Sequence, residues 1–144
     1  MGTPALFDIN IFEDVARARQ GWESSLNALA LVEEGDVDGY ISAWTVTVIY
    51  YFRRRLGASE KKARERTKAL TIEGGFRILA FDAEIIDQAL ADDRFSGFED
   101  AIQFHTAEQN GLNIMVTRNV KHFSQVKDEI AVLTPEELLA KEIF

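Results

Sequence analysis

The chain has 144 residues, of which 47% are hydrophobic and 28% charged, and its formal charge is −8. This length suits one hydrophobic core, so we expect residues 1–144 to form a single domain, and the hydrophobic content excludes an intrinsically disordered chain. The absence of cysteine excludes disulfide frameworks, thiolate nucleophiles and cysteine-ligated zinc. The negative charge argues against a protein that coats nucleic acid through a general positive field, although a few arginines can still form a local site.

The N-terminal sequence MGTPALFDIN has no basic segment ahead of an apolar stretch, and no run of about 18 apolar residues occurs anywhere. This pattern predicts a soluble cytoplasmic protein that does not contact membranes.

The first half of the chain alternates short apolar runs with segments of helical periodicity. The predicted elements, in chain order, are a strand over 4–8, a helix over 9–19, a helix over 22–34, a strand over 39–43 and helices over 45–57 and 60–70. Asn10 is expected to cap the first helix and Ser59 the last. The segment 45–57 is rich in β-branched and aromatic residues, but its length, its trailing arginines and its closing Gly57 favour a buried helix.

The second half continues the alternation of strands and helices. We predict a strand over 76–81, helices over 82–92 and 98–111, strands over 113–117 and 131–134, and a final helix over 135–144. Asp82 and Thr134 are the expected N-caps, and Gly111 ends the helix before it. Strands separated by helical crossovers imply a parallel sheet, so we predict an α/β fold, a three-layer α/β/α sandwich with a central parallel sheet of about five strands.

Ligands in open parallel sheets bind at the carboxyl ends of the strands. Asp8 ends the first strand and the tripeptide 117–119 ends the fourth, so both are expected at the same edge. Each group also has a simpler explanation when it is taken alone. Asp8 is explained equally well as a helix cap. Glu99 and Asp100 suit the dipole of a helix N-terminus, and residues 117–119 suit a turn. The convergence of the three groups favours a site.

The order of several short motifs resembles the PIN-domain superfamily, specifically VapC-like proteins. The motifs are Phe7-Asp8-Ile9-Asn10, Gly39-Tyr40-Ile41-Ser42 followed by Thr45, Thr47, Tyr50 and Tyr51, then Phe98-Glu99-Asp100-Ala101-Ile102-Gln103, Thr117-Arg118-Asn119-Val120-Lys121-His122-Phe123 and Leu133-Thr134-Pro135-Glu136-Glu137. They span nearly the whole chain in the family's order.

This resemblance implies a Mg²⁺- or Mn²⁺-dependent endoribonuclease that hydrolyses RNA with a metal-activated water, often as the toxin of a toxin–antitoxin pair. The implied partners are RNA, an antitoxin protein and a second copy of the chain, with the helices near Trp44 and Tyr51 as contact surfaces. Oxygen ligands suit these hard cations, which lower the pKa of water and neutralise charge on the phosphate.

Carried over by position, the resemblance assigns roles to ten residues. Asp8, Asp100 and Glu99 are the expected metal ligands, with Glu99 pointing about 100° away from Asp100 around the helix. The expected catalytic residues are Asp8, Asp100, Asn119 and Thr117, the threonine orienting water or ligand. The expected substrate-binding residues are Asn10, Ser42, Arg118, His122 and Arg53.

The chain departs from the family pattern in its acids. Many PIN nucleases carry a glutamate in the helix after the second strand, where this chain has Val48 or a neighbouring non-acidic residue. Asn119 stands where an aspartate is often found, and His122 replaces an aspartate that is common three residues later. The rival hypothesis is therefore a catalytically degenerate PIN fold that serves as a binding or interaction module. An unrelated phosphatase or response-regulator-like protein lacks its expected partner motifs.

Two further groups have alternative interpretations. His122 is either a phosphate contact or proton shuttle, or a loop residue facing solvent, and His105 is expected to be a packed helical residue. Tyr50, Tyr51 and Phe52, with Arg53 to Arg55, either stack bases and hold phosphates or belong to the core and a dimer surface.

Overall fold

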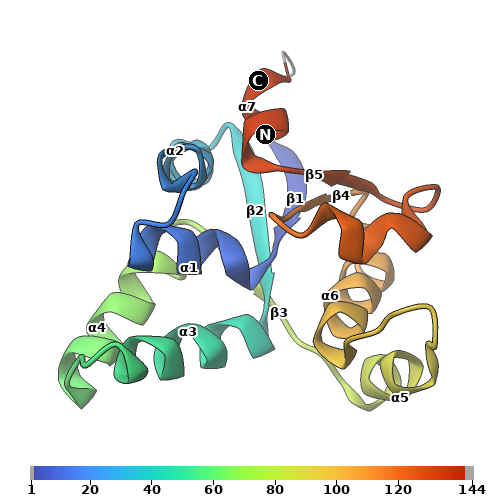
Figure 1. Cartoon of the computed structure of the whole chain (residues 1–144), viewed down its shortest axis with the longest axis horizontal. Helices are drawn as coiled ribbons and strands as arrows, with labels where there is room; N and C mark the ends of the chain where they lie inside the picture. The colour runs from blue at the N-terminus through green and yellow to red at the C-terminus, as the bar shows by residue number, and fades with distance from the viewer. Residues whose placement is uncertain (1, 142–144) are drawn as a thin grey trace.

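The computed structural model describes residues 2–141, and these form a five-stranded sheet with helices on both faces (Figure 1). The strands are β1 (Thr3–Phe7), β2 (Val37–Ser42), β3 (Arg77–Leu79), β4 (Ile114–Val116) and β5 (Ala131–Leu133). The helices are α1 (Ile9–Arg17), α2 (Trp22–Glu33), α3 (Ala43–Arg55), α4 (Glu60–Leu70), α5 (Ala83–Ala91), α6 (Phe98–Gln109) and α7 (Pro135–Ala140), with a 3₁₀ segment η1 (Val120–Val126).

All strand pairs are parallel, and their order across the sheet is β3-β2-β1-β4-β5. The predicted three-layer α/β/α sandwich with a five-stranded parallel sheet is confirmed. Every strand is therefore followed by a chain segment that leaves the same carboxyl edge, which is where the polar strand-end residues gather.

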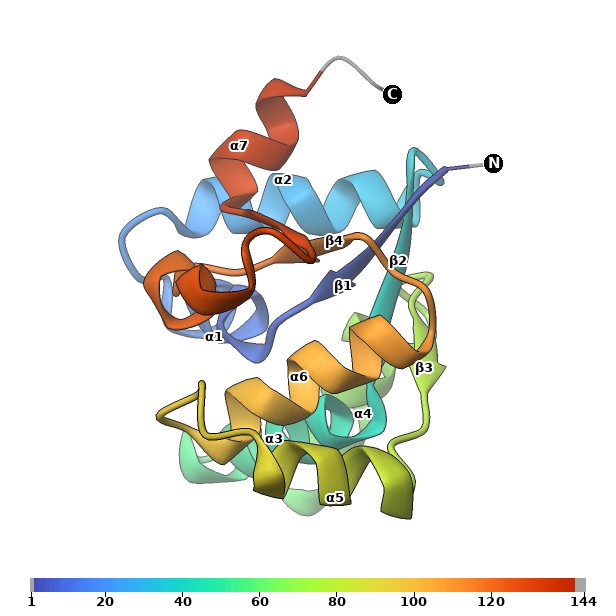
Figure 2. The same cartoon turned by 90° about the vertical axis from the view of Figure 1, so that its right-hand side faces the viewer.

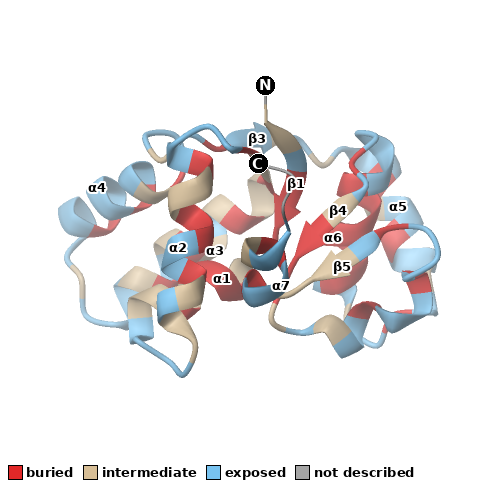
Figure 3. Ribbon diagram, turned by 90° about the horizontal axis from the view of Figure 1, so that it is seen from above, coloured by how far each residue is buried: buried red, intermediate tan, exposed pale blue. Residues whose placement is uncertain are grey.

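Alternation along β1 divides the core into two layers, because neighbouring strand residues point to opposite faces. Ala5 and Phe7 belong to the apolar cluster covered by α1, α2, α3 and α7, whereas Leu6 belongs to the cluster covered by α5, α6 and η1. Figure 2 shows α5 and α6 side by side on the second face, and Figure 3 shows buried residues concentrated along β1, β4 and the inner side of α6. Each helix of residues 2–141 is too short or too polar to cross a lipid bilayer.

The predicted helix positions agree closely with the structure where a capping side chain marks the start. Ser59 accepts from the Lys62 amide, and Thr134 and Glu137 form a reciprocal capping box. The final helix was predicted to reach residue 144; it ends at Ala140, and residues 142–144 lie outside the described part of the chain.

Three local predictions were wrong. Asp8, not Asn10, is the N-cap of α1, because Asp8 has extended backbone angles and its carboxylate accepts from the Ile9 amide. β2 begins at Val37 rather than residue 39, since Val37 pairs with Thr3 of β1. Residues 120–126 were assigned no element but form the 3₁₀ segment η1.

Candidate functional site

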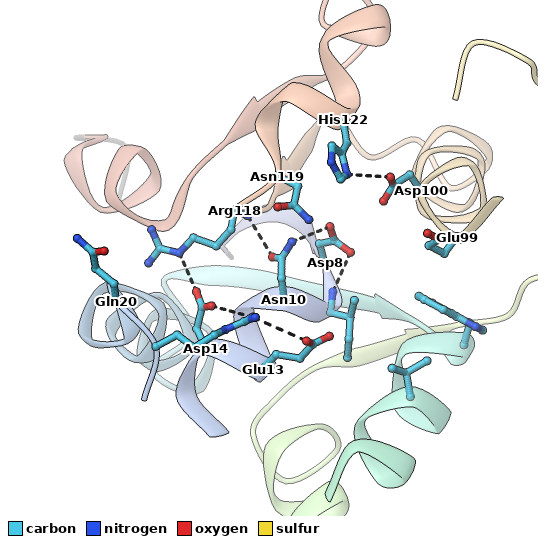
Figure 4. A pocket seen from close by; sticks show the side chains of 14 residues that line it. Asp8, Asn10, Glu13, Asp14, Gln20, Glu99, Asp100, Arg118, Asn119 and His122 are labelled. Carbon is cyan, nitrogen blue, oxygen red and sulfur yellow. Dashed lines mark hydrogen bonds and ion pairs between the residues drawn. The ribbon is translucent and has the colours of Figure 1, made fainter. Parts of the chain in front are cut away.

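A cavity of about 690 Å³ opens at the carboxyl edge of the sheet, where β1 and β4 end beside the first turn of α6 (Figure 4). Its acidic lining residues are Asp8, Glu13, Asp14, Glu99 and Asp100. Asn10, Arg118, Asn119 and His122 also face it, and Trp44 and Val48 supply an apolar wall from α3. The structure thus brings together the three polar groups that the sequence placed at this edge.

Asp8 is buried and held by four hydrogen bonds. Its Oδ1 accepts from the Ile9 amide at 2.8 Å and from the Gln103 side chain at 3.2 Å. Its Oδ2 accepts from Thr117 at 2.8 Å and from Asn10 at 3.3 Å. Burial raises the pKa of Asp8 above its ordinary value, and the bonds from Thr117 and Gln103 oppose that rise. All four donors are neutral, so Asp8 is fixed in position without a cation to balance its charge.

A second layer of bonds holds these donors in place. Asn10 donates to Thr117 at 3.1 Å and accepts from the Arg118 amide at 3.1 Å, so α1 and the end of β4 are joined through one side chain. The Asn119 amide donates to the Thr117 hydroxyl at 3.0 Å. Thr117 is fully buried, so in this structure its hydroxyl orients Asp8 rather than meeting water or a ligand.

Asp100 lies in the first turn of α6 and faces Asp8 across the cavity (Figure 4). Burial and repulsion from Asp8 raise the pKa of Asp100 to about 6, with a smaller contribution from Glu99. His122 opposes this rise, because its Nδ1 lies 3.1 Å from the Asp100 carboxylate while the imidazole remains half exposed. Burial and the neighbouring Asp8 thus both favour the protonated form of Asp100, and a cation near these carboxylates would favour the ionised form.

The donor set fits a hard divalent cation that keeps much of its water. Among residues 2–141 no group of three or more acidic or histidine side chains forms a closed metal cage. Mg²⁺, however, is commonly held by only one or two carboxylates, with water and phosphate completing its shell. Asp8 and Asp100 are the side chains that would hold it, and the long bond from Asn10 is the weakest of those it would compete with at Asp8. Glu99 is exposed at the rim of the cavity.

Several predicted substrate-binding residues are engaged elsewhere. Ser42 is fully buried, and its hydroxyl caps α3 by accepting from the Thr45 amide. Arg118 lines the cavity, but its guanidinium binds Asp14 at 2.7 Å and Glu136 at 2.5 Å. Arg53 lies outside the cavity, over a small hollow between α1 and α3. In this structure these three side chains therefore serve packing and charge pairing.

The site also contains residues that were not predicted from the sequence, and Gln103 and Glu13 are two of them. Gln103 is fully buried and bridges Asp8 to Thr45, donating to each at 3.2 and 3.0 Å. Its spacing of three from Asp100 places both on one face of α6, and that spacing could have revealed it. Glu13 follows Ile9 by four residues, so both lie on one face of α1, and both line the cavity. His105 lies away from the site and binds Asp92 at 2.8 Å.

The family model described as PIN domain matches residues 4–121 of this chain. No curated protein sequence matches the chain significantly. Among solved structures, a chain of a toxin–antitoxin complex from Klebsiella pneumoniae is 25% identical, with a TM-score of 0.66 and coverage of 91% of this chain and 97% of that one.

Two structures with lower sequence identity share the fold. VapBC-1 from nontypeable Haemophilus influenzae is 14% identical, with a TM-score of 0.69 and coverage of 93% and 99%. VapC20 from Mycobacterium tuberculosis, described as a toxin that cleaves the sarcin–ricin loop, is 15% identical, with a TM-score of 0.60 and coverage of 77% and 86%.

Proposed function

Because this chain belongs to the PIN-domain family, we propose that it is a Mg²⁺- or Mn²⁺-dependent endoribonuclease that acts as the toxin of a toxin–antitoxin pair. One observation carries the proposal: Asp8 and Asp100 face each other in one cavity, at the edge of the sheet where parallel folds bind ligands, and burial together with the neighbouring Asp8 raises the pKa of Asp100. Asp8 and Asp100 would hold a divalent cation there, which would balance their charge and supply attraction for the phosphate of RNA.

The cavity provides carboxylate oxygens as ligands for a cation. Its described lining contains no serine, threonine, cysteine, lysine or tyrosine, so water is the attacking group in this proposal. A bound cation would supply Lewis-acid polarisation of the phosphate and a lowered pKa of that water. Asp8 is oriented by four donors, and Asp100 is positioned by its contact with the half-exposed imidazole of His122.

The proposed protein partner is an antitoxin, because the similar structure from Klebsiella pneumoniae is a toxin–antitoxin complex. We also propose a homodimer in the cytoplasm. The exposed apolar side chain of Leu56, at the C-terminal end of α3, is consistent with a contact surface there. Light scattering after gel filtration measures the mass of the free chain and of any complex.

The alternative is a degenerate PIN fold that binds without catalysis. Val48 and Trp44, rather than an acid, form the α3 wall of the cavity, which favours this alternative. Cleavage of a mixed RNA substrate in Mn²⁺, in Mg²⁺ and in EDTA, by the wild-type chain and by Asp8→Asn and Asp100→Asn, separates the two. The enzyme cleaves only with a cation and only with both aspartates. Cleavage that persists in EDTA or in both variants refutes the proposal.

A further inference from the structure

A groove continues from the acidic cavity between helices α1 and α3, which leave the sheet edge together and remain in contact (Figure 1). It leads into a second cavity of about 320 Å³, lined by Glu13, Arg17, Val48, Tyr51, Phe52 and Arg55. Glu13 and Val48 line both cavities, so the two are adjacent. The α1 and α3 residues recur at intervals of three or four, and each helix therefore presents one continuous face to the groove.

We propose that this second cavity binds the nucleotide next to the scissile bond of single-stranded RNA, with Arg17 and Arg55 contacting phosphate and Tyr51 stacking on a base. The inference rests on the proposed ribonuclease function and adds the path that the RNA strand takes over the surface from the acidic cavity. From Ile9 to Arg17 the groove runs eight residues along α1, which is about 12 Å.

The charge distribution along the groove favours a polyanion. The end near Asp8 is acidic, whereas the far end carries two exposed arginines on separate helices. Val48 lies between the two ends, at the position where the family commonly has a glutamate, so this wall of the groove is uncharged. A cation held at the acidic end and the guanidinium groups at the basic end would contact successive phosphates.

The aromatic side chains provide a fixed stacking surface. Tyr51 is 61% exposed, and Tyr50 packs edge-on against it with ring centroids 5.1 Å apart. Tyr50 in turn hydrogen-bonds Glu60 of α4. An exposed aromatic ring beside a positive charge is the arrangement by which single-strand-binding proteins hold bases without reading their sequence.

Arg17 is held at the groove by the ring of Phe52, over which its guanidinium lies at 4.8 Å. Glu13 opposes phosphate binding, since it faces the same cavity and is offset only by Arg19 at 3.7 Å. Because these charges are opposite, the two substitutions change RNA affinity in opposite directions. Removing Arg17 weakens RNA binding, and removing the charge of Glu13 strengthens it.

The test measures binding of a short fluorescein-labelled oligouridine by fluorescence anisotropy in EDTA, where cleavage does not occur. Arg17→Gln, Arg55→Gln and Tyr51→Leu each lower affinity by about fivefold or more. Each arginine variant also reduces the slope of log affinity against log salt by roughly 0.7, as expected for one lost phosphate contact on a single strand. Glu13→Gln raises affinity.

The matched control is Arg54→Gln, which removes the same charge from the same helical turn. Arg54 donates to the Ala58 carbonyl and lies near Glu60, outside the groove, so its replacement leaves affinity close to that of the wild type. An equal loss in Arg54→Gln, or wild-type affinity in all three groove variants, overturns the inference. Displacement of oligouridine by a polyglutamate peptide of higher affinity also overturns it, in favour of a peptide site.

Failure of the proposed function gives a different result. If the wild-type chain never cleaves RNA in Mn²⁺ but shows the predicted pattern of binding in EDTA, the groove proposal stands and the nuclease proposal is refuted. If the wild-type chain cleaves RNA and the groove variants bind oligouridine normally, the nuclease proposal stands and the groove proposal is refuted. A wild-type chain that binds no oligouridine overturns the groove, and the nuclease is overturned as well only if that chain also fails to cleave RNA in Mn²⁺.

Discussion

Replacement of Asp100 by asparagine is expected to stabilise the metal-free protein at neutral and alkaline pH. The Asp100 pKa rises from 3.8 to about 6 on folding, so the native state resists ionisation of this carboxyl. Such a shift corresponds to roughly 3 kcal/mol at full strength. Because the cavity is open to water and the bond from His122 is weakened by the change, we expect a gain of about 1–2 kcal/mol.

The sign follows from proton binding. The folded chain holds the Asp100 proton more tightly than the unfolded chain, so the wild type loses stability as pH rises from about 4 through about 6. Asp100→Asn is free of this loss. Its advantage is therefore absent below about pH 4 and complete above about pH 7.

Thermal unfolding followed by circular dichroism in EDTA measures the effect. At about pH 8 the variant should melt about 3–7 °C above the wild type, and the two should converge near pH 4. Asp87→Asn, an exposed carboxylate on α5, is the matched control and should change little. Equal stability of Asp100→Asn and wild type at pH 8, or an equal gain at both pH values, would refute the argument that ionising Asp100, buried beside Asp8, costs stability.

Three other substitutions test separate parts of the structure. Arg118→Met should lower the free energy of unfolding by about 2–4 kcal/mol in urea, since it leaves Asp14 buried with one counter-ion fewer; a loss below about 0.5 kcal/mol would contradict this. Val48→Glu should tighten Mn²⁺ binding measured by calorimetry, while Thr47→Glu, exposed on the same helix and outside the cavity, should not; equal affinities would count against the site. Gly39→Ala should lower the free energy of unfolding in urea by about 1–3 kcal/mol, because a methyl group there would lie 2.6 Å from Val32. An unchanged urea midpoint would show that the surrounding side chains move to accommodate the methyl group.

Local sequence signals predicted the helices with strong caps, and the alternation of strands and helices predicted a parallel sheet. Ser59 and Thr134 mark helix starts through their own short-range bonds, and such bonds depend on little outside the neighbouring residues. The place of Asp8 at the sheet edge followed from strand and helix alternation. That Asp8 both caps α1 and lines the candidate site did not follow, because an aspartate between a strand and a helix is explained by either role alone.

Long-range contacts account for what the sequence did not reveal. Arg118 was predicted to meet substrate, but it binds Asp14 and Glu136, which are 104 and 18 residues away in the chain. Gln103 contacts Asp8 across 95 residues, and nothing near it in the sequence signals that contact except its spacing from Asp100. Such pairings arise only when α6 and β4 pack against β1.

Calorimetric titration of Mn²⁺ into the wild type, Asp8→Asn and Asp100→Asn at neutral pH tests the central claim most directly. The claim is that these two carboxylates form a divalent-cation site at the carboxyl edge of the sheet. We predict saturable binding to the wild type and its loss in both variants, even though each variant remains folded by circular dichroism. The same binding heat in all three proteins, or none in the wild type, would contradict the claim.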